Sequence, residues 1–189
     1  MNTACAKHAF GKSAKDKIFG ANAAAVEAIA KYGKDNVVNA TIGAILDEDE
    51  QLVCLPVVEK VFRNLPTNEI IAYAPISGLP DYLEAVLVAA FGESRPNAHL
   101  AAVATAGGSG AIHHTLWNYL DEGEAALCSD WYWGAYSVLC KDLHRGFTTY
   151  KMLDENNKFN LADLKEKVFA LLEKQDNLVY LLNTPAHNP

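Results

Sequence analysis

The amino-acid sequence predicts an α/β fold with a mainly parallel sheet covered by helices on both faces. Three observations predict it. After residue 100, short apolar stretches alternate with stretches whose apolar residues recur at helical spacing. A turn rich in glycine joins the first of these apolar stretches to the first of these helices. Half of the 189 residues are hydrophobic, which is enough to form a sizeable core.

Composition and charge exclude several classes of protein. The formal net charge is −7 and no basic stripe is present, so we expect no nucleic-acid partner. No stretch is long and apolar enough to span a bilayer, and we expect no membrane partner. The four cysteines show neither metal-type spacing nor a dense disulfide framework: Cys5, Cys54, Cys128 and Cys140. This pattern predicts reduced thiols and a cytoplasmic location.

Helix signals dominate the chain before residue 100. An alanine-rich helix is expected from Asn22 to Tyr32, where Gly33 ends it. Pro56 begins another helix and Pro66 stops it, and Pro80 begins a third. We therefore expect an N-terminal arm and a small helical region ahead of the α/β part.

The strands and helices after residue 100 follow in alternation. The last helix is expected from Leu161 to Leu172, with Asn160 as its N-cap. Four strands are predicted, at Leu100–Thr105, Ala125–Ser129, Gly146–Lys151 and Leu178–Asn183. Since crossover helices separate the strands, the sheet is expected to be mainly parallel.

The glycine-rich turn from Thr105 to Ala111 is the most informative motif. Glycine lets the backbone approach a ligand closely, and a helix start presents unpaired N–H groups at the positive end of its dipole. Ser109 adds a hydroxyl group to Gly107, Gly108 and Gly110. The combination suits a phosphate group, although a plain tight turn with a helix cap would use the same residues.

Polar and aromatic residues follow the strands at the end where parallel sheets bind ligands. Trp131 and Trp133 come after the second strand, and Asn183–Pro189 come after the fourth. A flat indole ring can stack on a flat aromatic ligand, and a carboxamide can donate to a phenolic oxygen. The implied ligand is a planar heteroaromatic phosphate, with core packing as the alternative role of either tryptophan.

Four segments together resemble the fold-type-I pyridoxal-phosphate aminotransferases, the class that includes the aspartate and aromatic aminotransferases. The resemblance runs from about Asp16 to the last residue. The segments resemble the family's substrate-side glycine segment, its tyrosine–glycine segment, its phosphate loop and the start of its Asn-Pro-Thr-Gly motif: Asn39–Ala44, Tyr73–Leu79, Gly107–Ala111 and Ala186–Pro189.

The resemblance implies a role for each matching residue. Gly108 and Ser109 would hold the phosphate of pyridoxal 5′-phosphate, and Trp133, which matches the family's Trp-Gly pair as Trp131 does not, would stack on the pyridine ring. Asn188 would hydrogen-bond the phenolic oxygen, and would also lie on the substrate side. Gly43 would lie near the substrate carboxylate, and Tyr73 would reach the partner's cofactor phosphate in a homodimer.

Structural alternatives remain for three of these residues. Gly43 could form a bulge, Tyr73 could be a packed ring with one hydrogen bond, and Asn188 could be a turn residue before proline.

The implied reaction moves an amino group from an amino acid to a 2-oxo acid, with the cofactor as electron sink. In the family, the Schiff-base lysine, the pyridine-facing aspartate and the carboxylate-binding arginine all come later than the Asn-Pro motif. We therefore assign no catalytic residue in this chain, and the lysine is expected beyond Pro189. The chain is expected to be an incomplete and inactive fragment that is unstable or aggregates by itself.

The resemblance also implies a domain division. Residues 1–55 would form an N-terminal arm and part of a small domain. Residues 56–189 would form the first portion of the large cofactor-binding domain.

Three other functions stay open. A decarboxylase or a carbon–sulfur lyase of the same fold would share the phosphate loop and the stacked ring. A non-catalytic dimerising fragment would keep Tyr73 without any chemistry. A nucleotide-binding domain would use the glycine turn, but this turn lacks the Lys-Ser/Thr ending of a P-loop and the dinucleotide spacing.

Overall fold

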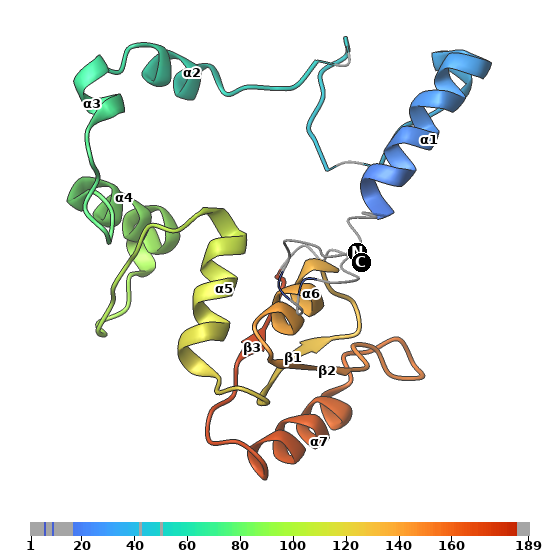
Figure 1. Ribbon diagram of the computed structural model, residues 1–189, viewed down its shortest axis with the longest axis vertical. Helices are drawn as coiled ribbons and strands as arrows, with labels where there is room; N and C mark the ends of the chain where they lie inside the picture. The colour runs from blue at the N-terminus through green and yellow to red at the C-terminus, as the bar shows by residue number, and fades with distance from the viewer. Residues whose placement is uncertain (1–5, 7–8, 10–16, 42, 50, 185–189) are drawn as a thin grey trace. The chain divides into compact units, whose positions relative to one another are not determined.

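The computed structural model describes residues 6, 9, 17–41, 43–49 and 51–184 (Figure 1). The chain divides into two compact units, Met1–Ala72 and Tyr73–Pro189. The domain boundary predicted between residues 55 and 56 lies inside the first unit, and that division stays a prediction. Among the described residues, no helix combines the length and the apolar character that crossing a membrane requires.

The described part of the first unit is helical, with connecting segments. Its helices are α1 (Lys17–Tyr32), the 3₁₀ turn η2 (Lys34–Asn36), α2 (Pro56–Arg63) and α3 (Thr67–Ile71). Gly33 follows α1 as predicted, and its N–H donates to the Ile29 carbonyl at 2.9 Å. The helix begins before the predicted Asn22, since alanines and the preceding residues all tolerate helical backbone. Pro56 occupies the first position of α2, as predicted.

The second unit holds the sheet. Its elements are α4 (Pro80–Phe91), η3 (Gly92–Ser94), α5 (Gly107–Tyr119), β1 (Ala125–Ser129), α6 (Ala135–Asp142), β2 (Gly146–Tyr150), α7 (Leu161–Leu172) and β3 (Tyr180–Leu181). In the part of the chain that the structure describes, three strands pair in the order β2-β1-β3, and both pairings are parallel. The predicted parallel α/β fold is confirmed.

Two apolar clusters show which helices cover which face of the sheet. Ala126 of β1 packs with Leu116 and Leu120 of the α5 region and with Cys140 of α6. The next residue, Leu127, belongs to a separate cluster that includes Leu171 of α7 and Tyr150 of β2. Successive strand residues point to opposite faces, so α5 and α6 cover one face and α7 covers the other.

Two of the predicted strands differ from the structure. The segment from Leu100 to Thr105 forms no ladder with another described strand, although the Ala104 N–H donates to the Ser77 carbonyl at 2.8 Å. The strand expected over Leu178–Asn183 is paired only at Tyr180–Leu181. An apolar stretch shows that a segment suits a strand, whereas a ladder also requires a neighbour with free backbone groups.

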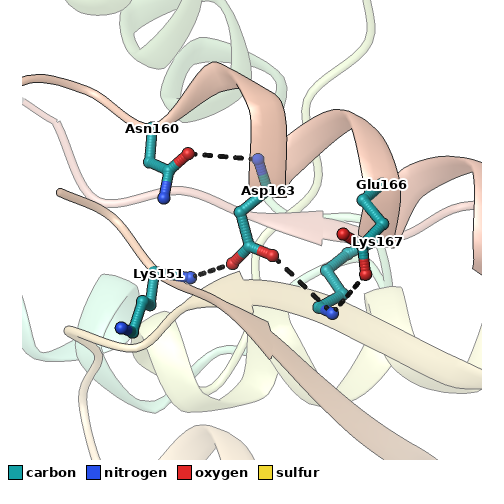
Figure 2. A network of polar contacts seen from close by, with 5 residues as sticks. All are labelled: Lys151, Asn160, Asp163, Glu166 and Lys167. Atoms are coloured by element: carbon teal, nitrogen blue, oxygen red, sulfur yellow. Dashed lines mark hydrogen bonds and ion pairs between the residues drawn. The ribbon is translucent and has the colours of Figure 1, made fainter. Parts of the chain in front are cut away.

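A polar network fixes the start of α7 against the end of β2 (Figure 2). The Asn160 side chain accepts from the Asp163 N–H at 3.1 Å, which confirms the predicted N-cap. The Asp163 carboxylate accepts from the Lys151 N–H at 2.6 Å and lies 3.6 Å from the Lys167 ammonium. The hydrogen bond that Lys167 donates to Glu166 raises the pKa of the lysine. The network joins the helix to the strand that it covers.

Candidate functional site

The chain path brings three segments to the carboxyl edge of the sheet. A short connection joins the end of α5 to the start of β1. Because the helix runs back along the sheet, its first turn lies near the carboxyl end of β1. Ile112, in the second turn of α5, packs on the cluster that also contacts Leu181 at the end of β3. The loop after β1 and the residues after β3 leave the sheet at this same edge (Figure 1). Ligands of parallel sheets bind at such an edge.

The glycines at the start of α5 meet different structural needs. Gly107 has φ +65°, a conformation that other residues rarely adopt. At Gly110, an added Cβ would lie 3.2 Å from the Ala106 Cβ, which is a tight contact. Gly108 shows neither feature: its φ is not positive, and an added Cβ would meet no atom within 4 Å. Nothing in its described surroundings requires glycine there, and the space beside it is open.

The first turn of α5 can hold an anion. The helix begins at Gly107, inside the glycine-rich segment described as a turn, so Gly108 and Ser109 lie within its first turn. N–H groups in a first turn have no partner inside the helix, and they lie at the positive end of the helix dipole. The N-cap residue, Ala106, offers no side-chain hydrogen bond. The exposed Ser109 adds its hydroxyl group to this turn.

Trp133 lies in the loop that joins β1 to α6, and its side chain is partly buried. Its ring meets the Tyr136 ring edge to face, with 5.7 Å between the ring centroids and 89° between the planes. Its carbonyl accepts from the Tyr136 N–H at 2.9 Å. Trp131 is more open, with 46% of its surface exposed. The Trp133 ring is thus packed on one side against Tyr136.

Tyr136 and Asn183 form a polar pair that sequence reasoning missed. The buried Tyr136 hydroxyl donates to Asn183 Oδ1 at 2.6 Å. The Asn183 Nδ2 atom is buried and has no hydrogen-bond partner among the described residues. A carboxamide directly after a strand is a usable signal, but Tyr136 resembles any aromatic residue on a helix. An unpaired buried donor is costly, so this atom is a candidate partner for an acceptor bound at the edge.

Tyr73 is fully exposed, with a relative exposure of 105%. Its segment is attached to the residues that precede the glycine turn, because Ser77 accepts from the Ala104 N–H. Gly78 makes the close approach possible: its φ is +109°, and an added Cβ would lie 2.9 Å from the Ala104 Cβ. The ring of Tyr73 therefore takes no part in packing within the described chain, while the backbone behind it is held.

The positions of the two remaining predicted site residues relative to this edge stay a prediction. Gly43 lies in the first unit, where it is exposed. Its φ is not positive, and an added Cβ would meet no atom within 4 Å, so neither backbone nor packing in that unit requires a glycine. Asn188, with the rest of Ala186–Pro189, lies outside the described residues. Across the described ranges, no group of three or more histidine, cysteine or acidic side chains is placed to hold a metal ion.

Comparisons with known proteins identify a matching family model and several structures with a similar fold. The family model for aminotransferase class I and II matches residues 35–189. A crystal structure of an aminotransferase from Anaerococcus prevotii aligns with all of this chain at 34% identity and a TM-score of 0.93, and this chain covers 46% of it. No curated protein matches.

More distant structures agree. A mitochondrial aspartate aminotransferase from Trypanosoma brucei is 26% identical over 78% of this chain, with a TM-score of 0.61 and 39% of its own length covered. An aromatic amino acid aminotransferase from Burkholderia cenocepacia is 25% identical over 78% of this chain, with a TM-score of 0.61 and 38% covered. The chain thus spans less than half the length of these structures. On the extent of the family match, the chain belongs to the class I and II aminotransferases.

Proposed function

We propose that the protein containing this chain is a pyridoxal-phosphate-dependent aminotransferase. It transfers an amino group between an amino acid of the aspartate or aromatic type and a 2-oxo acid. The observation that carries the proposal is the family match over residues 35–189. The start of α5, whose first-turn N–H groups can bind an anion, supports it, because parallel sheets bind ligands at this edge.

The start of α5 fits the phosphate of the cofactor. Open space beside Gly108 leaves room for a group that a side chain would displace. The N–H groups of Gly108 and Ser109 and the Ser109 hydroxyl would then donate to phosphate oxygens, as helix starts do elsewhere.

The loop after β1 fits the pyridine ring. Trp133 would lie against the ring face, and the edge-to-face contact with Tyr136 would keep the indole in place. Asn188 would donate to the phenolic oxygen and adjust the electron demand of the ring. When bound, pyridoxal phosphate supplies an electron sink for the charge that forms as the substrate loses its α-proton.

Substrate and partner contacts complete the proposal. Gly43 would leave room for the substrate carboxylate, which agrees with the open space around it. Tyr73 would donate to the cofactor phosphate of a second copy in a homodimer, which agrees with its complete exposure. We place the enzyme in the cytoplasm, where the described free thiols of Cys54, Cys128 and Cys140 would stay reduced.

The test is a turnover assay on the full-length protein supplied with pyridoxal phosphate. Aspartate and aromatic amino acids are offered with a 2-oxo acid, and formation of the matching oxo acid and new amino acid is followed. We expect transamination, and we expect Ser109→Ala to weaken cofactor affinity by roughly 10- to 150-fold, the effect of one charge-assisted hydrogen bond. Ser94→Ala, at an exposed serine in η3, is the matched control.

The products separate the alternatives. Release of carbon dioxide would indicate a decarboxylase of the same fold, and release of ammonia with cleavage of the side chain would indicate a lyase. A full-length protein that dimerises without binding the cofactor would support a non-catalytic role.

A further inference from the structure

A cluster of three polar side chains joins α1 to the segment that leads to Gly43. Asn39 Nδ2 donates to Asn22 Oδ1 at 2.9 Å. The Thr41 hydroxyl lies 2.7 Å from Asn39 Oδ1 and 3.3 Å from Asn22 Oδ1. The Thr41 N–H also donates to Asn39 Oδ1, at 3.2 Å. All three residues lie in the first unit, so the cluster does not depend on how the two units are arranged.

The cluster explains the path of the chain after α1. Asn22 and Tyr32 are separated by ten residues of helix, which spans about 15 Å. The chain ends the helix at Gly33 and must return over a similar distance to bring Asn39 back to Asn22. The 3₁₀ turn η2 (Lys34–Asn36) follows Gly33, and the Asn39–Asn22 hydrogen bond shows that the residues after this turn lie beside α1. The residues before Gly43 therefore run back along α1 and attach near its start.

The three side chains contribute different hydrogen-bonding groups to the cluster. Asn22 contributes only its carbonyl oxygen, which accepts, while Asn39 donates through Nδ2 and accepts through Oδ1. The Thr41 hydroxyl has one proton, and the shorter distance assigns that proton to Asn39. The link between the helix and the segment thus depends on one acceptor atom, Asn22 Oδ1.

Gly43 is two peptide units beyond Thr41, so its Cα lies within roughly 7.6 Å of the Thr41 Cα. Fixing Thr41 restricts where Gly43 can lie. We propose that Asn22, acting through Asn39 and Thr41, is a positioning residue that holds the Gly43 segment in place for the carboxylate of the amino-acid substrate. This inference rests on the proposed function, because Gly43 has a substrate to contact only in an aminotransferase.

The test compares matched variants of the full-length protein. Asn22→Leu keeps the size of the side chain and removes the acceptor, whereas Asn22→Asp keeps an acceptor at the same position. Asn36→Leu is the control, since Asn36 donates to the Tyr32 carbonyl in the same unit without contacting the cluster. Each variant is measured for KM, kcat, cofactor affinity and amide hydrogen exchange over residues 39–44.

We expect Asn22→Leu to raise KM for the amino acid by roughly 3- to 10-fold, the effect of one or two lost hydrogen bonds. Cofactor affinity should not change, and amide exchange over residues 39–44 should accelerate. Asn22→Asp should stay near wild type in each measurement, and so should Asn36→Leu.

Three results would overturn the inference. The first is an unchanged KM and unchanged exchange in Asn22→Leu. The second is equal loss in Asn22→Asp, which would show that an acceptor is not what matters. The third is a parallel fall in kcat and cofactor affinity, which would indicate general damage to the fold. If the wild-type protein shows no transamination, the proposed function is wrong, and so is the substrate role of Asn22. Amide exchange over residues 39–44 would still show whether Asn22 holds the segment in place.

Discussion

The α/β region and the helices that precede it differ in burial far more than in local sequence signals. Among the described residues, every buried hydrophobic side chain of the core lies between Leu116 and Val179. By contrast, the apolar residues of α2 are exposed, including Val57 at 67% and Phe62 at 71%. Both regions contain helices that begin where the sequence predicts, α2 in the first and α4 and α7 in the second.

The comparison separates helix formation from burial. Proline at the first position begins α2 and α4, and an asparagine cap begins α7, so each helix start has a local cause. Burial of α7 depends instead on contacts with β1 and β2, which lie far away in the sequence. A local signal can therefore build a helix whose apolar face has no covering neighbour in the described structure.

The largest effect is expected from truncating a core leucine. Leu127 is fully buried, and Leu127→Ala should lower the free energy of unfolding of the full-length protein by about 2–5 kcal/mol. Leu52 is 75% exposed, and Leu52→Ala should change it by less than about 0.5 kcal/mol. Urea denaturation followed by circular dichroism measures both. Equal losses would show that the first unit is packed as tightly as the sheet.

Thiol reactivity gives a second contrast between the two regions. Cys54 is exposed, whereas Cys128 and Cys140 are buried. Burial raises the pKa of the Cys140 thiol to about 11, which leaves on the order of a thousandth of it as reactive thiolate at pH 8. Burial also raises the pKa of Cys128.

Alkylation at pH 8, read by peptide mass spectrometry, should therefore modify Cys54 at least about a hundredfold faster than either buried thiol. Cys5→Ser provides the background, since Cys5 lies outside the described residues. Concentrated urea should remove the difference. Fast alkylation of Cys140 in the native protein would contradict the packing of α6 on the sheet.

A smaller effect is expected where a glycine joins the exposed Tyr73 segment to the residues before α5. Gly78→Ala places a Cβ 2.9 Å from the Ala104 Cβ and requires φ +109°, so it should cost about 2–3 kcal/mol of unfolding free energy. Gly92→Ala also requires a positive φ but in open space, so about 1–2 kcal/mol is expected from the backbone conformation alone. Thermal unfolding of the two variants isolates the contact. Equal decreases in melting temperature would show that the segment around Gly78 does not pack against Ala104.

The site was predicted unevenly for a physical reason. The glycine turn and Trp133 stand out because their residue types are unusual at the end of a strand. Tyr136 and Asn183 are 47 positions apart in the sequence, and neither residue type indicates that the other is its hydrogen-bond partner. The cluster of Asn22, Asn39 and Thr41 was missed in the same way, because a lone asparagine on an alanine-rich helix is typical of a surface position.

The sequence alone determined where the helices after Pro56, Pro80 and Asn160 begin, where β1 lies, and which family the segments resemble. These features depend on backbone preferences and caps that act within a few residues. Only the tertiary structure decided that α5 begins at Gly107, that Leu100–Thr105 forms no ladder with a described strand, and which side chains meet across the sheet edge. Ladders and long-range side-chain pairs form only when two distant segments come into contact. Their interaction free energy depends on both segments, so neither segment indicates it alone.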